Sequence, residues 1–206
     1  NMLANEMFLD SAALRSSVVS HAKTLGYEPT SCRAPVATVN ISLETDSPTK
    51  TMVAGTAFTT TVDGTSFQFV TIADITASNI GNTVAFDSTS LYEGTYVTIK
   101  YIVDTSDVEQ RFLLTDDRAD TSTLTVQVQN AVNDSNLTTY TKATDITQLS
   151  ATSSVYFLQE VENGRFEVYF GDDVVSKALS DGNVVILKYV VTNKTAANGA
   201  SSFSAP

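Results

Sequence analysis

Few side chains in this sequence are suited to catalysis or metal binding, and two of them occur only once. The 206 residues include one histidine, His21, and one cysteine, Cys32. A catalytic histidine needs a nucleophile or an orienting carboxylate beside it, and a cation such as Arg33 favours the thiolate form of a neighbouring cysteine. No signature of a nucleophilic enzyme surrounds either residue, so we predict a surface or partly buried His21 and a non-catalytic Cys32. A single histidine and a single cysteine also cannot supply a His/Cys zinc site or an internal disulfide.

Two groups of aspartates are the other candidates for chemistry: Asp116, Asp117 and Asp120, and then Asp172 and Asp173. Loop carboxylates can bind calcium, but neither group has the EF-hand spacing. Aspartates also start turns by accepting hydrogen bonds from nearby backbone amides, and we predict this role for both groups. A carboxylate pair for glycan hydrolysis stays open as an alternative, since such a pair is defined in space. We predict that the protein is not an enzyme and has no catalytic, cofactor-binding or metal-binding residue and no cofactor.

The chain is acidic, and its charge is uneven. Lys and Arg number 12 against 23 Asp and Glu, which gives a net charge of -11. Residues 1–50 hold five acids and four bases, a net of -1, and residues 51–206 hold 18 acids and eight bases, a net of -10. Binding to nucleic acid needs clustered cations, so we predict no nucleic-acid partner. The excess negative charge serves either solubility or a face for a basic partner.

No membrane-spanning or targeting segment is predicted. The sequence has no apolar run of about 18 residues, and its start has no basic stretch before an apolar block. It begins with Asn and ends in a polar tail, so we expect a fragment of a longer protein. A hydrophobic content of 42% is sufficient for a core.

Residues 10–26 hold the one predicted helix. Asp10 or Ser11 is the expected N-cap, and Gly26 is the expected left-handed residue that ends the helix. Apolar residues recur at helical spacing, and we expect this face to pack on the β-rich region or on a neighbouring subunit. The face consists of Leu14, Val18, Val19, Ala22 and Leu25.

After Pro35 the apolar pattern has a period of two, which is typical of half-buried strands. Asp63-Gly64 and Asn163-Gly164 are predicted hairpin turns. The predicted fold class is α+β, predominantly β, with one N-terminal helix followed by two β-rich units of similar strand order. The predicted strands cover residues 36–43, 56–62, 66–72, 83–86, 96–103, 123–129, 155–161, 165–170 and 184–191.

The β-rich part has an internal similarity. Residues 93–103 resemble residues 181–191 at an offset of 88, and three shorter matches earlier in the chain keep the same order at offsets of 84 to 88. We therefore predict three regions: a helix and loop over residues 1–35, a first β-rich domain over 36–120 and a second over 121–206. Duplication predicts that Gly94 and Gly182 occupy equivalent turns before equivalent strands.

Two segments carry longer motifs. Residues 8–41 combine Asp10, a Leu14-Arg15 pair, an Ala-Lys-x-Leu-Gly-Tyr helix end at 22–27 and a small-residue start of the first strand at 34–37. Residues 156–193 combine a strand, a hairpin, a Phe-Gly-Asp turn, an Asp-Gly-Asn sequence and a final strand, and a small-residue segment follows at 197–199. In these two sets of motifs the chain resembles the baseplate J family of contractile-tailed phages. It resembles more closely the T-even-type wedge proteins of the inner baseplate ring. The family usually has Gly at the positions of Asp173 and Ser176, so the shape of that turn is expected to differ.

The resemblance implies a structural subunit of the virion, located in the tail baseplate and assembled in the host cytoplasm. It implies a homo-oligomer, with the chain as a dimer within a ring around the tail hub. It also implies binding to other wedge proteins, and it implies no small-molecule substrate. A carbohydrate- or receptor-binding β-module of a tail fibre or adhesin is the alternative, and it predicts aromatic side chains in exposed loops. Most aromatic residues here fall in predicted strands, where packing into a core is expected. A glycan-degrading enzyme that uses an Asp/Glu pair is a third hypothesis.

Overall fold

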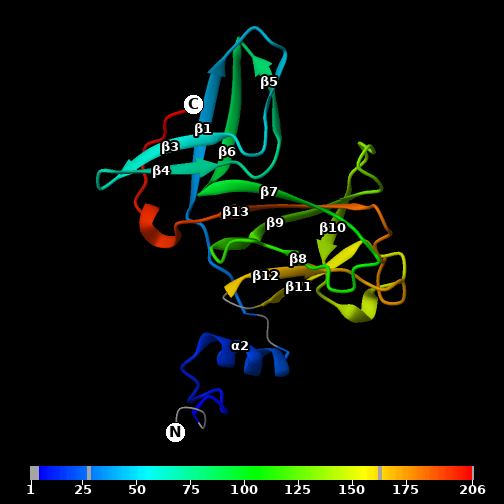
Figure 1. Cartoon of the computed structure of the whole chain (residues 1–206). Helices are drawn as coiled ribbons and strands as arrows, with labels where there is room; N and C mark the ends of the chain where they lie inside the picture. Colours follow the sequence, from blue (N-terminus) through cyan, green and yellow to red (C-terminus); the bar gives the residue numbers. More distant parts are fainter. Residues whose placement is uncertain (1–4, 27–28, 162–163, 206) are drawn as a thin grey trace. The chain divides into compact units, whose positions relative to one another are not determined.

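The computed structural model of the chain describes residues 5–26, 29–161 and 164–205 (Figure 1). One helix longer than a single turn precedes thirteen strands in these residues, which confirms the predicted, predominantly β fold class. Residue contacts divide the chain into two compact units. Unit 1 consists of Asn1–Ser31, Ile99–Ala119 and Thr125–Leu187, and unit 2 of Cys32–Thr98, Asp120–Leu124 and Lys188–Pro206. This grouping differs from the predicted domains over residues 36–120 and 121–206; the internal duplication stays a prediction.

Helix α2 (Arg15–Thr24) is shorter than the predicted helix over residues 10–26. The predicted N-cap at Asp10 or Ser11 is wrong, because Leu14 is the N-cap residue and makes no side-chain cap hydrogen bond. The Glu6 carboxylate supplies acceptors instead, at 3.0 Å from the Ala13 N–H and 3.3 Å from the Leu14 N–H. A distant carboxylate can satisfy amides just before a helix as a cap residue does.

The end of α2 lies where the sequence predicts it, whereas the apolar face of α2 is only partly buried. Gly26 has a φ of 76°, and its N–H donates to the carbonyl of Lys23, as expected for a left-handed helix end. Val19 is buried, but Leu14 and Leu25 are 46% and 72% exposed. The chain itself therefore leaves much of both leucines uncovered, and packing of this face on the β-rich region or on a neighbouring subunit stays a prediction.

The first sheet has six strands in the order β2-β5-β6-β4-β3, with β1 paired to β6. Strand β1 alternates as predicted, since Ala37, Val39 and Ile41 are half-buried and the residues between them are exposed. Strands β2 and β5 were not predicted from the sequence. The strands are β1 (Val36–Glu44), β2 (Thr49–Met52), β3 (Ala57–Val62), β4 (Thr65–Val70), β5 (Ile75–Ile80) and β6 (Thr83–Glu93).

Two hairpins of this sheet have two-residue turns. Asp63 and Gly64 have φ values of 50° and 80° between paired Val62 and Thr65, which confirms the predicted turn. Gly81 and Asn82, with φ values of 63° and 64°, connect β5 to β6 in the same way. Positive φ at both central residues defines the type I′ turn, whose twist matches that of the flanking strands.

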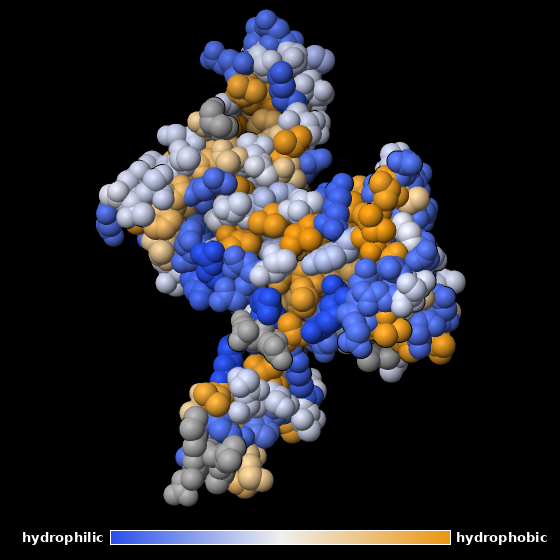
Figure 2. All heavy atoms as spheres, viewed as in Figure 1, coloured by the Kyte–Doolittle hydropathy of each residue, from blue (hydrophilic) through white to orange (hydrophobic). Residues whose placement is uncertain are grey.

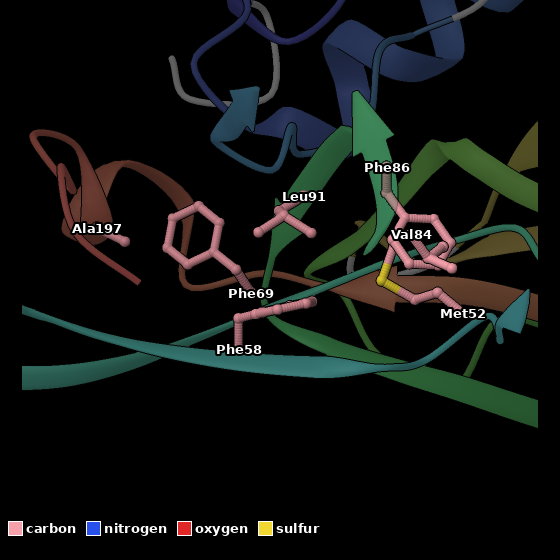
Figure 3. Close-up of a cluster of buried hydrophobic side chains, with 7 residues drawn as sticks. All are labelled: Met52, Phe58, Phe69, Val84, Phe86, Leu91 and Ala197. Carbon is pink, nitrogen blue, oxygen red and sulfur yellow. The ribbon is translucent and has the colours of Figure 1, made fainter. Parts of the chain in front are cut away.

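The core of unit 2 lies on the six-stranded sheet. Phe69 is at its centre, and the ring of Phe203 from the C-terminal segment meets it edge-on with centroids 5.0 Å apart. Ser204 forms a β-bridge with Thr59 beside this contact, so the C-terminal segment is fixed to β3. The buried side chains, drawn in Figure 3, are Met52, Phe58, Phe69, Val84, Phe86, Leu91 and Ala197.

The second sheet has seven strands in the order β7-β13-β9-β10-β11-β12-β8. Strand β13 lies between β7 and β9 and is buried over almost its whole length, as its continuous apolar sequence requires. The short strands β8 and β10 were not predicted. The strands are β7 (Thr95–Ile102), β8 (Phe112–Leu113), β9 (Ala119–Gln129), β10 (Thr138–Lys142), β11 (Val155–Glu160), β12 (Phe166–Tyr169) and β13 (Val184–Val191); two 3-10 turns are η1 (Ile146–Gln148) and η3 (Lys194–Ala197).

Strands β11 and β12 pair antiparallel, as the predicted second hairpin requires. The Asn163 of its predicted Asn-Gly turn lies outside the described residues, and Gly164 has a φ of 74°. A chain of aromatic edge-to-face contacts then runs through unit 1, with ring centroids 5.4 to 5.6 Å apart. Its members are Tyr101, Phe112, Phe170 and Tyr140.

Candidate functional site: buried carboxylates and exposed apolar side chains

The single histidine makes a contact within the N-terminal region, and the single cysteine lies in the segment after the helix. His21 is half-buried on α2, and its Nε2 lies 2.8 Å from the carbonyl oxygen of Glu6. This contact ties the N-terminal segment to the helix. Cys32 is half-buried after the helix.

The aspartates of the first group are used for structure. Asp116 accepts hydrogen bonds from the Arg118 N–H at 2.8 Å and from its guanidinium at 3.3 Å. Burial raises the pKa of Asp116, but these bonds from Arg118 outweigh burial and lower it overall. Asp120 is buried and accepts from the Ala34 N–H at 2.9 Å and from the Ser122 N–H and hydroxyl. Asp117 is exposed.

The second group shapes a turn after Phe170. Asp172 Oδ1 accepts from the amides of Val174 and Val175, and Asp173 Oδ1 accepts from the Ala178 N–H. Asp173 has a φ of 63° and so takes the left-handed conformation at the first position where the family usually has Gly, whereas Ser176 does not. Ser176 is buried against Gly171, where an added Cβ would lie 2.0 Å from the Ser176 hydroxyl.

Metal binding and membrane insertion find no support in the part of the chain that the structure describes. No three acidic, histidine or cysteine side chains there are grouped so that they could hold a metal ion. No helix among the same residues combines the length and the apolar character needed to cross a bilayer.

Glu160 on β11 anchors helix α2 within unit 1. Its side chain is 2% exposed, and it accepts from Nε and Nη2 of Arg15, both at 2.8 Å. The Lys23 ammonium donates to the backbone carbonyl of the same residue. A planar guanidinium matches a carboxylate in this two-point geometry, so the pair fixes the helix in position as well as holding it. No local pattern in the sequence indicates this contact.

Glu167 on β12 forms a second ion pair of the same kind. It accepts from Arg111 Nε at 3.0 Å and Nη2 at 2.7 Å, and from Gln159 Nε2 at 3.2 Å. The hydrogen bonds from Arg111 lower the pKa of Glu167, against a smaller opposing effect of burial. The charged form of Glu167 is therefore favoured in the folded state.

We expect Glu167→Gln to remove a pH-dependent part of the stability. Since folding lowers this pKa from its ordinary value of 4.5, the contribution is complete above that value and is lost as pH falls through the lower folded value. The free energy of unfolding of the wild type should exceed that of Glu167→Gln by about 1 kcal/mol at pH 7, and this difference should shrink below pH about 4.5. Urea unfolding of both proteins between pH 7 and pH 3 measures it. Glu109→Gln, at an exposed carboxylate, is the matched control; a difference independent of pH would contradict the prediction.

Glu93, at the end of β6, is a fully buried carboxylate in unit 2. Oε2 accepts from the Thr192 hydroxyl at 2.6 Å and the Asn193 N–H at 2.9 Å, and Oε1 accepts from Asn193 Nδ2 at 2.8 Å. These donors follow directly after β13. The carboxylate therefore joins the β6–β7 corner to the start of the C-terminal segment.

Aromatic side chains are mainly in the interior, as predicted. Phe69, Tyr156 and Phe166 are buried, and Phe157 stacks on Tyr169 with ring centroids 5.2 Å apart. Of the aromatics predicted to lie in strands, Tyr169 is the one that is more than a third exposed among the described residues. Aromatic platforms in exposed loops, which the receptor-binding alternative predicts, are not favoured by this arrangement.

Large apolar side chains are exposed on several surfaces of the described chain. One group lies in the N-terminal segment and helix, and another lies in the loops of unit 1. Scattered single residues of this kind are normal, but adjoining ones mark contact surfaces. The N-terminal group is Met7, Phe8, Leu9, Leu14 and Leu25; the loop group includes Val108, Val132 and Leu137, with Ile102 at the end of β7 beside it.

These features define a predominantly β protein in which buried carboxylates hold separate segments together and several large apolar side chains are exposed. Comparison with known proteins is consistent with this class. The family model described as the third domain of the bacteriophage baseplate wedge protein gp6 matches residues 97–200. The chain therefore belongs to the gp6 baseplate wedge family.

A relative from Enterobacteria phage T4, named baseplate wedge protein gp6, is 28% identical over 225 aligned residues. The alignment covers 99% of this chain and 33% of that protein, so the chain spans about a third of the length of the relative. Membership of the family places the protein in the baseplate of the virion tail.

Proposed function

We propose that the chain is a structural subunit that assembles with itself and with other wedge proteins into the ring around the tail hub. The family match over residues 97–200 carries this proposal. The geometry supports it as well, because rigid sheets with short turns present fixed surfaces, and repeated fixed contacts close a symmetric ring. A dimer within the ring is the proposed self-contact.

The proposal includes that the chain is not an enzyme and takes no small-molecule substrate. In support, the buried carboxylates Glu93, Glu160 and Glu167 all bind hydrogen-bond donors of the chain itself. Their oxygens are thus engaged by the fold itself, whereas glycosidic catalysis needs two carboxylates that act on a bound substrate. A net charge of -11 also supports protein partners rather than nucleic acid.

Antibody labelling of phage particles that contain the protein tests its location. The antibody is raised against the chain, and labelled particles are viewed by electron microscopy before and after disassembly of the tail. Label on the baseplate at the end of the tail is expected. Label on the fibres would contradict the proposal and favour a receptor-binding module; absence of label from disassembled tails would contradict both.

Light scattering of the purified chain after size-exclusion chromatography tests the self-contact. A mass of about twice 22.0 kDa at micromolar concentration is expected for the dimer. A monomer at every concentration up to the solubility limit would contradict self-assembly of this chain while leaving its place in the baseplate intact.

A further inference from the structure

Three loop segments of unit 1 are joined by hydrogen bonds into one surface, here called the loop surface: residues 103–110, 130–137 and 178–183. Asn183 connects all three, because its carbonyl accepts from the Val103 N–H at 2.8 Å and its Nδ2 donates to the Asn130 carbonyl at 3.0 Å. The Thr105 N–H donates to Asp181 at 3.1 Å and adds a second link. The loop surface is therefore a continuous part of unit 1.

Apolar side chains are exposed across this surface. Val108 is 90% exposed, Val132 62%, Ile102 58% and Leu137 44%. Val108 lies in the first loop segment, Val132 and Leu137 lie in the second, and Ile102 ends β7 where the first segment begins. Over the β9–β10 connection, which holds residues 130–137, Figure 2 shows hydrophobic surface beside hydrophilic surface. Such a combination of apolar side chains with a polar surround is typical of a protein-binding surface.

The charge of the loop surface has one sign. The three loop segments contain five acids and no Lys, Arg or His; of the cations that adjoin them, Arg111 is paired with Glu167 and Lys177 precedes the third segment. Hydrogen bonds from Ser106 lower the pKa of Asp104, and those from Asn136 and Asn130 lower the pKa of Asp134, so both remain ionised at neutral pH. The acids are Asp104, Asp107, Glu109, Asp134 and Asp181.

The loops are also held in shape by their own side chains. Gln110 closes the first loop by donating to the Ile102 carbonyl at 2.8 Å and accepting from the Asp104 N–H at 3.1 Å. Asp134 closes the second loop by accepting from Asn136 and Asn130. A surface that is already ordered loses less conformational entropy when a partner binds.

We propose that the loop surface binds a segment of another baseplate protein in which apolar side chains are flanked by Lys or Arg. This inference rests on the proposed function and names the partner chemistry of one surface. Charge complementarity selects the partner: the apolar residues supply buried area, and the five acids favour cations around it. Two copies of the loop surface facing one another would place five acids against five, so self-contact through this surface is disfavoured.

Photo-cross-linking within the assembled tail tests the proposal. A photoreactive amino acid replaces Val108, and the same residue replaces Val53, an apolar side chain 56% exposed in unit 2, as the matched control. We expect position 108 to form an adduct with a different protein, at a site whose neighbouring residues include Lys or Arg. An adduct with a second copy of the chain, an adduct at an acidic site, or no adduct from position 108 would overturn the proposal.

Incorporation under competition gives a second readout. Wild type and Val108→Asp are expressed together, and the ratio of the two in purified tails is measured by mass spectrometry. We expect Val108→Asp to be depleted about tenfold, whereas Val53→Asp is incorporated at parity. Parity for both variants would overturn the docking role. Antibody label away from the baseplate would instead contradict the proposed function, so the two failures are distinguishable.

Discussion

Gly94→Ala is expected to destabilise the chain by about 3 kcal/mol or more. Gly94 has a φ of 123°, a backbone conformation that residues with a Cβ rarely adopt. A Cβ built there would lie 2.1 Å from the carbonyl oxygen of Val191 and 3.0 Å from Cγ1 of Val190. Since the nearest obstacle is backbone at the end of β13, relief requires movement of a buried strand. Urea unfolding followed by circular dichroism measures the loss.

Gly182→Ala is the matched control for this prediction. Gly182 also precedes a strand and has a positive φ of 75°, but a Cβ there meets no atom within 4 Å. The Gly182→Ala variant should lose only about 1–2 kcal/mol of stability, because alanine is less favourable than glycine in the left-handed conformation. Similar losses for the two variants would contradict the steric argument, because they would show that the conformation alone determines the effect.

Local sequence was sufficient to predict most of the strands and one hairpin turn. Residues 56–72 combine alternating β-formers with Asp63-Gly64, and both signals act between neighbours in the chain. Strand β10 has exposed polar residues around Tyr140, and β8 has only two residues. Such strands exist because another strand pairs with them, and local preference does not contain that information. The start of α2 was misplaced for a similar reason, because its amides are satisfied by Glu6.

The carboxylates that matter most to the structure were not among the predicted candidates. Glu160 and Glu93 find donors 145 and 100 residues away, and no spacing rule connects such positions. A signal was nevertheless present in the sequence. Glu160 ends an apolar strand, where a buried acid requires a partner. The aspartate groups are candidates for chemistry because their members are close in sequence. Most of their hydrogen bonds, however, are made to residues nearby in the chain and shape turns.

Glu93→Ala is expected to be among the most damaging side-chain changes in unit 2, with a loss of about 3–5 kcal/mol. The substitution removes the acceptor of three donors: the Thr192 hydroxyl, the Asn193 N–H and Asn193 Nδ2. Thr192 is fully buried, so its hydroxyl has no access to bulk water in place of the carboxylate. Glu44→Ala, at an exposed glutamate that ends β1, is the control and should cost less than about 0.5 kcal/mol.

Glu93→Gln and a double-mutant cycle separate the hydrogen bonds from the volume of the side chain. Glutamine keeps the shape, but its NH2 group faces one of the donors, so we expect an intermediate loss of about 1–3 kcal/mol. Thr192→Val removes one donor, and its loss should be less than additive with that of Glu93→Ala, because both changes break the same bond. The free energies of unfolding of the four proteins of this cycle, measured by urea unfolding, give the coupling energy. Full additivity would show that Glu93 and Thr192 act independently, and the stabilising role assigned to their hydrogen bond would then be wrong.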